Sequence, residues 1–401
     1  MDGMKKSTVV LRRCETYEKA DVGAAVSDCI DALGGADVLF PDKGARILIK
    51  PNLLTRAAPE KAVTTHPSVF GAVCRYLREA GCTELSYGDS PGTHFAGVKN
   101  TAEACGIAAE AEQYGVSLGD FEGGEETPFP DGITAKSFVI THAALSCDRI
   151  VNVCKLKTHM LERMTGAQKN LFGIVYGFNK GATHVKYPNS VEFARALADL
   201  NRFRPPVLHI MDAVVAMEGN GPSGGVPRDM GWILASTDPV ALDTVACTLI
   251  SLDPALVPTN EIGAEYGVGH TASEKIEVLL LDGAHRETLT LAEVAERYSV
   301  PDFDVYRGSQ DKGEIKQLKP FRRFLDKRPV INAEKCVGCG VCVESCPQKP
   351  KAVAFPKGKK VPRYNYRLCI KCFCCQEMCP RHAISAQTPR LARLIDRNWK
   401  L

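Results

Sequence analysis

The sequence predicts an α/β domain, with a largely parallel sheet and flanking helices, followed by a small cysteine-rich domain. In the front part of the chain, short apolar segments alternate with helix-like segments, a pattern typical of a largely parallel sheet. Eight of the 17 cysteines form two copies of one motif near the C-terminus. The length of 401 residues is sufficient for two or three domains of roughly 150 residues each.

Six strand-like segments are expected in the front domain, and polar residues follow each of them. The segments are residues 46–50, 84–87, 149–153, 207–211, 232–235 and 276–281. In an open sheet of parallel strands, ligands bind beyond the carboxyl ends of the strands. The placement of the polar residues therefore predicts a common site at that edge of the sheet.

Two helices have clear boundary signals. Residues 67–80 have helical spacing, and Gly81 is a candidate to end this helix. Residues 240–250 follow Asp238, whose side chain is expected to cap the helix. Residues 164–174 (MTGAQKNLFGI) are also helix-like. We therefore expect helices that flank the sheet.

The predicted organisation has four parts. Residues 1–311 form the α/β domain, 312–329 a basic linker interrupted by proline, 330–386 the cysteine-rich domain, and 387–401 a C-terminal helix that packs back on the body. The only clear internal repeat in the sequence is the pair of cysteine runs, which lie 33 residues apart.

Each cysteine run reads C-x2-C-x2-C-x3-C and is followed by proline. This is the ligand pattern of a bacterial ferredoxin with two [4Fe–4S] clusters, in which the fourth cysteine of each run is aimed at the other cluster. The predicted ligands of cluster I are Cys336, Cys339, Cys342 and Cys379, and those of cluster II are Cys369, Cys372, Cys375 and Cys346.

Disulfide bonds and zinc sites both fit this cysteine pattern poorly. A disulfide framework is typical of a short secreted chain, and zinc sites use pairs of C-x2-C rather than triplets. The sequence shows no signal-like start and no run near the ~20 apolar residues of a membrane span, so we expect a cytoplasmic protein without membrane contact. Nine further cysteines, including the spare thiol Cys374 beside Cys375, indicate a reducing compartment and favour an anaerobe.

The net charge of +3 conceals an asymmetry along the chain. Residues 316–401 contain 20 Lys and Arg against 5 Asp and Glu, so this part carries +15 and the rest −12. We expect the basic residues to offset the anionic clusters, to raise their reduction potentials or to dock an acidic electron donor. Nucleic-acid binding is not expected, because few aromatic residues stand among the basic ones.

Three lysines, Lys50, Lys155 and Lys157, follow predicted strands. Lys155 and Lys157 are separated by one residue and therefore point the same way in an extended chain. Convergent lysines suit a carboxylate or phosphate ligand. Any one of them alone is better explained as a solvated loop lysine, but their occurrence together at strand ends favours an anion site.

Further polar residues complete the candidate site. Asp89 and Ser90 lie in GDSPG, whose glycines would let backbone N–H groups approach an anion, although a plain turn has the same composition. His66, His159 and His184 are candidate proton donors or metal ligands, although a lone loop histidine is more often neither.

Lys169 and Asn170 stand out among apolar neighbours, because buried polar groups need partners or a ligand. Glu218 lies at the bend of the glycine-rich segment 212–225. The sequence has no G-x-x-x-x-G-K-[ST] phosphate loop and no convincing G-x-G-x-x-G after a strand, so nicotinamide binding in a standard dinucleotide fold is unsupported.

These observations lead to one predicted set of site residues. We predict catalytic roles for His66, His159, Lys155 and Asp89. Substrate binding is predicted for Lys50, Asn52, Ser90, Lys157, Lys169, Asn170, His184 and Glu218.

Taken together, the motifs resemble the family called domain of unknown function 362. They are KPNLL (50–54), TTHP (64–67), GDSPG (88–92), KLKTH (155–159), TGAQKNLFG (165–173) and DAVVAMEGNGP (212–222). The resemblance covers about residues 7–285, and members of that family often carry a C-terminal two-cluster ferredoxin module, as here.

The segment KLKTHMLERMTGAQKNLFGIVYG is also faintly similar to a segment of the lactate racemase family, whose members bind an organonickel cofactor. That similarity implies cofactor contacts at Lys155, His159, Lys169 and His184.

The sequence favours an oxidoreductase in which two [4Fe–4S] clusters relay low-potential electrons to a small anionic substrate or cofactor in the α/β domain. A redox partner protein is expected, and a further organic or metal cofactor is left open. One alternative is a non-catalytic electron-transfer or assembly protein that docks a partner enzyme. Another is a racemase-like, non-redox enzyme.

Overall fold

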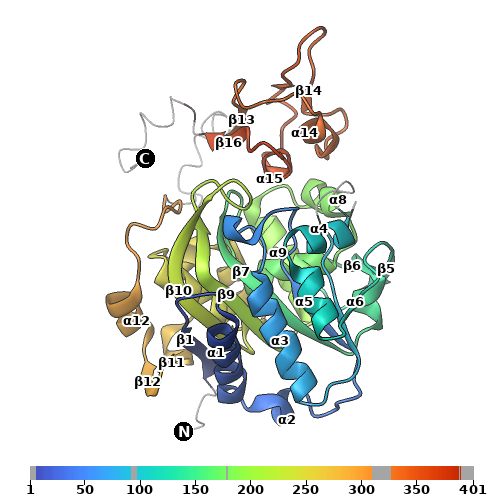
Figure 1. Cartoon of the computed structure of the whole chain (residues 1–401). Coiled ribbons are helices and arrows are strands. Elements are labelled where there is room, and N and C mark those ends of the chain that lie inside the picture. The colour runs from blue at the N-terminus through green and yellow to red at the C-terminus, as the bar shows by residue number, and fades with distance from the viewer. Residues whose placement is uncertain (1–5, 92–96, 178, 309–326, 388, 390–401) are drawn as a thin grey trace.

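The computed structural model describes residues 6–91, 97–177, 179–308, 327–387 and 389, and it consists of a large front domain and a small domain above it (Figure 1). We call residues 327–387 the module. Most of the predicted linker (312–329) and of the predicted C-terminal helix (387–401) lies outside the described residues. The linker prediction was wrong at its end, because Arg328 and Pro329 already belong to a strand of the module.

A ten-stranded sheet forms the centre of the front domain. Its order is β12-β11-β1-β10-β9-β7-β2-β3-β4, with β8 paired to β7 beside this path. The pairs β1–β11, β9–β7, β7–β2, β2–β3 and β3–β4 are parallel, and the other pairs are antiparallel. The sheet is therefore mixed but mainly parallel, which confirms the predicted fold class.

The strands of this sheet are β1 Ser7–Arg13, β2 Ile47–Pro51, β3 Leu85–Tyr87, β4 Ser117–Leu118, β7 Arg149–His159, β8 Arg163–Thr165, β9 Leu208–Glu218, β10 Val226–Ser236, β11 Ile276–Asp282 and β12 His285–Leu289. A separate hairpin pairs β5 Gly124–Pro128 with β6 Ser137–Thr141.

Helices cover both faces of the sheet, and Figure 1 shows α1, α3 and α5 in front of it. In β1, Val10 joins the core beneath α1 and α3, whereas Val9 and Leu11 join the core beneath α10, as the alternation of a strand requires. The α-helices of the front domain are α1 Lys19–Ala32, α2 Gly35–Leu39, α3 Pro67–Glu79, α4 Val98–Ala104, α5 Ile107–Gln113, α6 His142–Ser146, α7 Ala167–Asn170, α8 Asn179–Lys186, α9 Ser190–Phe203, α10 Pro239–Leu249, α11 Pro258–Glu265 and α12 Leu291–Tyr298.

The predicted helix boundaries are confirmed. Helix α3 ends just before Gly81, which has a φ of 87°, a left-handed conformation that glycine adopts without strain. Asp238 caps α10 by accepting hydrogen bonds from the backbone N–H groups of Val240 and Ala241.

Strands β7, β9 and β10 are each at least six residues longer than the sequence analysis predicts. Strand β7 continues to His159 and β9 continues to Glu218, so Lys155 and Lys157 lie inside a strand instead of following one. Residues 164–174 were expected to be helical throughout, but they begin in β8 and continue as α7 and the 3-10 turn Leu171–Ile174. The polar site therefore lies within the sheet and not only at its edge.

The module consists of two similar halves. Strand β13 (Arg328–Ile331) pairs with β16 (Ile384–Gln387), and β14 (Val353–Ala354) pairs with β15 (Arg363–Tyr364). Each cysteine run contains a one-turn helix, α14 (Val341–Glu344) or α15 (Cys374–Glu377). In Figure 1, α15 lies on the side of the module that faces the front domain and β14 lies on the opposite side.

Among the described residues, no helix has both the length and the hydrophobicity that crossing a membrane requires.

Candidate functional site

Three lysines are buried in neighbouring parallel strands. Lys50 lies in β2, and Lys155 and Lys157 lie in β7; their exposed fractions are 0%, 2% and 1%. This burial excludes the alternative that the three lysines are solvated loop residues. A buried ammonium is costly unless it is paired or neutral, so the partners of each lysine are informative about the site.

Lys155 is held by a tyrosine and an aspartate. Its ammonium lies 2.8 Å from both the Tyr17 hydroxyl and the Asp212 Oδ2, and Tyr17 in turn donates to the Asp212 Oδ1 at 2.8 Å. Asp212 also accepts the backbone N–H of His66, whose ring stacks on Tyr17 at 3.5 Å. Burial lowers the pKa of Lys155 despite Asp212, and it lowers the pKa of His66 to about 4. His66 is therefore a neutral, stacked side chain in this network.

A chain of amides holds Lys157. Its ammonium donates to the Asn52 Oδ1 at 2.8 Å and to the Val63 carbonyl at 2.6 Å. The Asn52 amide donates to Asn170, and Asn170 donates to Asn152, at 2.8 and 2.7 Å. The predicted ligand residues Asn52 and Asn170 are thus occupied with each other and orient Lys157.

The third lysine pairs with the turn after β3. The Lys50 ammonium lies 3.1 Å from the Asp89 Oδ1 and donates to the Pro51 carbonyl at 2.9 Å. The Asp89 Oδ2 accepts the backbone N–H of Leu53, while the backbone N–H of Ser90 donates to the Gly173 carbonyl. A Cβ at Gly173 would collide with the Asp89 carboxylate and the Lys50 side chain, so this close approach requires glycine.

His159 joins the sheet to the module. Its Nδ1 accepts the backbone N–H groups of Leu161 and Glu162, both at 3.1 Å, so the neutral ring carries its proton on Nε2. That Nε2 lies 2.8 Å from the Oε1 of Glu377 on α15. Burial lowers the pKa of His159 to about 4. Burial opposes ionisation of Glu377, but His159, Lys169 and His184 outweigh it and hold the Glu377 pKa at about 2.

Two ionisable groups near His159 lack a hydrogen-bonding partner among the described residues. Glu162 is fully buried, and neither of its carboxyl oxygens accepts a hydrogen bond from this part of the chain. Burial raises the Glu162 pKa to about 8, against the charges of Lys169 and Arg163. Lys169 is half-buried, and no hydrogen bond or ion pair of its ammonium is recorded within the described ranges. Buried polar groups normally have partners, so this pair indicates the position of a ligand or of ordered water.

Two further predicted residues, His184 and Glu218, differ in how they relate to the lysines and His159. His184, on α8, packs its ring against Phe193 at 4.5 Å and contributes to the field at Glu377. Glu218 does not join the lysines: its carboxylate accepts the backbone N–H of Asp304 and lies 3.9 Å from Arg228. Sequence reasoning missed Asp212, Glu162 and Glu377 as members of the site.

The glycine-rich bend between β9 and β10 contacts the module. The Gln376 amide donates to the Asn220 carbonyl at 3.2 Å and to the Gly221 carbonyl at 3.1 Å, and the Ser223 hydroxyl donates to the Glu377 carbonyl at 3.0 Å. A Cβ at Gly221 would collide with the backbone of Thr158, so glycine lets the bend lie against β7. The bend holds α15 over the end of β7.

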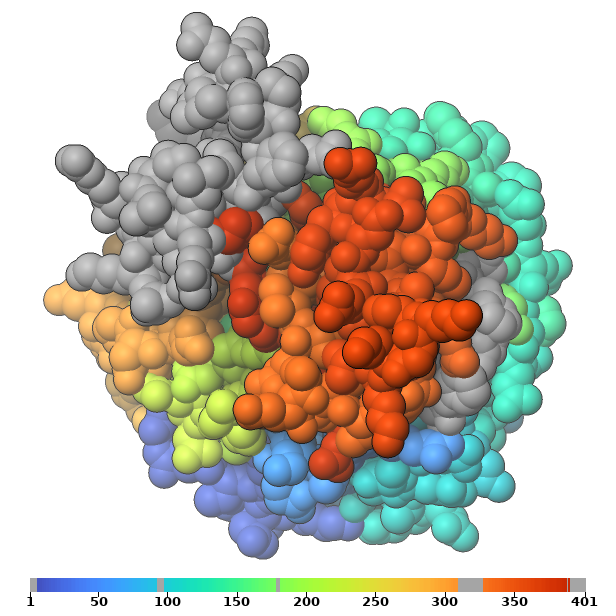
Figure 2. All heavy atoms as spheres, turned by 90° about the horizontal axis from the view of Figure 1, so that it is seen from above, coloured from blue at the N-terminus to red at the C-terminus, as the bar shows by residue number. Residues whose placement is uncertain are grey.

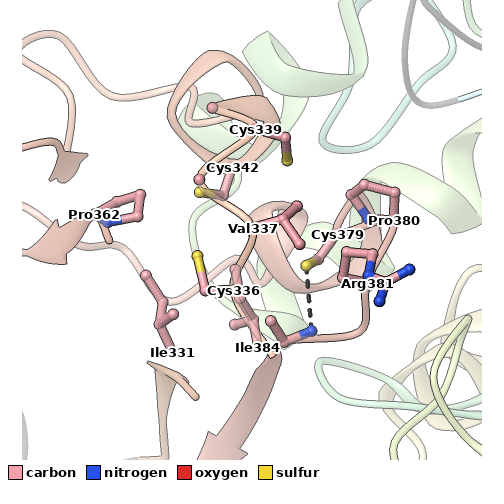
Figure 3. A pocket seen from close by; sticks show the side chains of 13 residues that line it. Ile331, Cys336, Val337, Cys339, Cys342, Pro362, Cys379, Pro380, Arg381 and Ile384 are labelled. Atoms are coloured by element: carbon pink, nitrogen blue, oxygen red, sulfur yellow. Dashed lines mark hydrogen bonds between the residues drawn. The ribbon is translucent and has the colours of Figure 1, made fainter. Parts of the chain in front are cut away.

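The eight motif cysteines line two separate cavities in the module, in the two sets that the sequence analysis assigned. Cradle I is lined by Cys336, Cys339, Cys342 and Cys379, together with Ile331, Val337, Pro362 and Ile384 (Figure 3). Cradle II is lined by Cys346, Cys369, Cys372 and Cys375, together with Pro329, Val353, Tyr364 and Phe373.

Both cradles suit an iron–sulfur cluster. Apart from the thiols, their linings are mostly apolar, with Arg381 in cradle I and Gln348 in cradle II as polar members. Three cysteine sulfurs accept hydrogen bonds: Cys379 from the Ala383 N–H (3.3 Å), Cys346 from the Ala352 N–H (3.4 Å) and Cys375 from the Tyr364 hydroxyl (3.1 Å). Such bonds stabilise thiolate ligands and tune cluster potentials. Among the described residues, no three His, Cys, Asp or Glu side chains converge on a single metal ion.

An open cleft of about 790 Å³ separates the two domains beside these networks. Ser90, Pro91 and Tyr176 line it on the front domain, and Cys346 and Pro347 line it on the module. A molecule in this cleft would lie beside cradle II and beside the turn that carries Asp89.

We expect Lys157 to titrate near neutral pH. Burial, followed by the charge of Lys169, lowers its pKa to about 7, whereas a lysine in an unfolded chain titrates near 10.4. The unfolded state therefore binds more protons between these values, and the stability contribution of Lys157 rises with pH from about 7 to about 10.4. The ¹³Cε chemical shift in lysine-labelled protein measures this titration, and Lys157→Met identifies the signal. A midpoint above pH 9 would contradict the expectation.

Two family models match the chain. One is described as "Domain of unknown function (DUF362)" and matches residues 47–248; the other is described as "4Fe-4S dicluster domain" and matches residues 328–380. These matches confirm the family resemblance and the iron–sulfur nature of the module. Among curated proteins, the "Thylakoid-associated protein sll1697" of Synechocystis sp. is 34% identical over 268 residues, which are 67% of this chain and 82% of that protein.

Solved structures resemble the chain only distantly. The lactate racemase apoprotein of Thermoanaerobacterium thermosaccharolyticum aligns with a TM-score of 0.40 and 14% identity, over 59% of this chain and 56% of its own. A Thermotoga maritima protein aligns with a TM-score of 0.34 and 12% identity, over 57% of each chain. The chain thus spans little more than half the length of either structure.

Proposed function

Because this chain belongs to the family described as domain of unknown function 362 and carries a 4Fe–4S dicluster domain, we propose that it is an iron–sulfur oxidoreductase. In this proposal the module holds one [4Fe–4S] cluster in each cradle. When bound, the clusters supply single low-potential electrons. The destination of the electrons is a small anionic molecule at the lysine-lined site of the front domain.

The contact between Glu377 and His159 is the main support for this proposal. Glu377 lies between Cys375 and Cys379, which belong to different cradles, and its carboxylate is 2.8 Å from the ring that ends β7. The same strand carries Lys155 and Lys157. A buried polar contact therefore connects the cysteine-bearing helix directly to the lysine-bearing strand, as electron delivery to that strand requires.

The unpartnered groups define the chemistry of the ligand. The Lys169 ammonium would bind a carboxylate or phosphate, and the buried Glu162 would accept a hydrogen bond from a hydroxyl or amino group of the same molecule. Lys157, with a pKa of about 7, is suited to give and take a proton near neutral pH. The hydrogen-bond networks around Lys50 and Lys155 hold β2, β7 and β9 in place around Lys157.

Reoxidation of the reduced protein tests this function. The whole chain is reduced under argon, freed of reductant and mixed with a panel of small carboxylates and phosphates, while visible absorbance reports cluster oxidation. At least one compound should reoxidise the wild type faster than buffer does. Lys169→Met should slow that reaction about tenfold, which corresponds to losing about 1.4 kcal/mol of ligand binding.

Lys186→Met is the matched control, because Lys186 is an exposed lysine on nearby α8. Its rate should equal that of the wild type. If no compound in the panel reoxidises the protein, or if Lys169→Met reacts as fast as the wild type, the non-catalytic electron-transfer alternative is favoured instead.

A further inference from the structure

The module is strongly basic, and most of its cationic side chains are exposed. Residues 327–387 contain twelve Lys and Arg but only three acidic residues, Glu334, Glu344 and Glu377. Glu377 is turned inward against His159, so it does not reduce the charge of the outer face. Figure 2, which views the molecule from above, shows this side of the module uncovered by the front domain. The face therefore presents a positive field to solvent.

Cradle I lies close to this outer face. Cys339 is exposed, Val337 beside it is 61% exposed, and Phe355 is 41% exposed. The loop between β14 and β15 packs directly on the cysteine run: a Cβ at Gly338 would lie 2.6 Å from the Lys360 carbonyl, and one at Gly340 would lie 3.7 Å from the Phe355 ring. The basic loop and cradle I are thus in contact.

A groove of about 500 Å³ runs beside cradle I. Its apolar side chains include Ile331 and Pro362, which also line cradle I, and its cationic side chains are Lys359, Lys360 and Arg363. A protein loop in this groove would be separated from cradle I by one layer of side chains, a short distance for electron transfer.

Cradle II borders the front domain. Its cysteine Cys346 lines the cleft shared with Ser90 of the front domain, and α15, which carries Cys375, contacts His159 through Glu377. Tyr364 lines both the groove and cradle II, but only cradle II shares a cysteine with that cleft.

We propose that the groove and the basic residues around it dock a small acidic electron-carrier protein, which delivers electrons at cradle I. This inference rests on the two-cluster relay proposed above. Cys336, Cys339, Cys342 and Cys379 would hold the cluster that accepts one electron from the carrier at each encounter, leaving the carrier oxidised by one electron. The cysteines of cradle II would hold the cluster that passes the electron on toward the lysine site.

A carrier protein fits this face better than a lipid surface or a nucleic acid. The groove is concave and has an apolar floor, which suits a protruding loop with acidic flanks more than a flat lipid surface. Its tyrosines, Tyr364 and Tyr366, stack on each other at 5.6 Å, and Tyr364 donates to Cys375, so they do not form a platform for nucleic-acid bases.

Charge reversal of the groove tests the proposal. Reduced flavodoxin, a small acidic flavin protein, is mixed with the oxidised whole chain, and stopped-flow absorbance gives the rate of cluster reduction. Calorimetry with oxidised flavodoxin measures binding without electron transfer. Lys359→Glu with Lys360→Glu should lower the association rate about tenfold at low ionic strength and much less at 0.5 M salt, where exposed charges are screened.

Lys275→Glu with Arg286→Glu is the matched control, because it makes the same charge change on the front domain, just before β11 and in β12. It should leave binding and reduction unchanged. Reduction by methyl viologen, a cation that needs no basic dock, should be equal in all variants and shows that the clusters are intact. This separates loss of docking from failure of the relay.

The proposal is overturned if the groove variant binds and accepts electrons like the wild type, or if the control variant loses as much. It is also overturned if flavodoxin fails to bind while a 20-nucleotide single strand or phosphatidylglycerol vesicles bind through Lys359 and Lys360.

Discussion

Cys375→Ser should remove one cluster and leave the other, lowering the iron content from about eight to about four atoms per chain. Cys375 lines cradle II and receives a hydrogen bond from Tyr364, so its loss removes a ligand and disturbs its support. Serine is a poor ligand for iron–sulfur clusters compared with a thiolate. Iron analysis and electron paramagnetic resonance of the dithionite-reduced protein measure the effect.

The adjacent thiol provides a closely matched control. Cys374 is next to Cys375 in α15 but lines neither cradle, so Cys374→Ser should keep its full iron content. A second pair tests the crossed assignment, in which each run lends its fourth cysteine to the other cluster. Cys336→Ser and Cys379→Ser should remove the same resonance signal, and Cys346→Ser the other. If Cys336→Ser and Cys346→Ser instead removed the same signal, each cluster would take all four of its ligands from one run.

Asp212→Ala should destabilise the front domain by about 3–5 kcal/mol, a large part of the stability of an ordinary domain. Asp212 is fully buried and accepts hydrogen bonds from Lys155, Tyr17 and the backbone of His66. Its removal leaves an uncompensated ammonium in the core. The midpoint of urea unfolding, followed by Trp232 fluorescence in a Trp399→Phe background, measures the change.

Two variants separate the loss of the ion pair from a general effect of shortening an aspartate. Asp282→Ala, at the exposed end of β11, should change the midpoint little. Lys155→Met combined with Asp212→Ala should be more stable than Asp212→Ala alone, because no unpaired charge remains in the core. Equal stability of these two variants would exclude the ammonium as the cause.

The sequence predicted the two sets of cysteines that line the cradles, because three members of each set are close in the chain and the fourth follows from the ferredoxin pattern. The crossed pairing of runs is reproduced by the linings of the two cradles. The lysines were placed correctly at neighbouring strands but not inside them. The alternation that extends β7 was present in the sequence: Lys155, Lys157 and His159 alternate with Cys154, Leu156 and Thr158. The polarity of Lys155, Lys157 and His159 led to the prediction of a loop, but in the structure these side chains are buried within β7.

The site residues that the sequence analysis missed have roles that depend on contacts between distant segments of the chain. Glu377 reaches His159 across 218 positions of sequence, and no local pattern marks that pair. Glu162 belongs to the site only because β8 folds back on β7, which buries its carboxylate near Lys169. Glu218 was included for its place in a glycine-rich bend, but the bend serves the contact with the module, and Glu218 itself points to Asp304. Such roles require the tertiary structure.

The small size of α15 has a consequence for how the protein matures. A four-residue helix is too short to persist alone, and the positions of Cys375 and Cys379 tie its shape to metal insertion. Glu377, between these two cysteines, can meet His159 only when that helix exists. A chain without iron is therefore expected to lose this contact and to expose the end of β7, where His159 lies, to water.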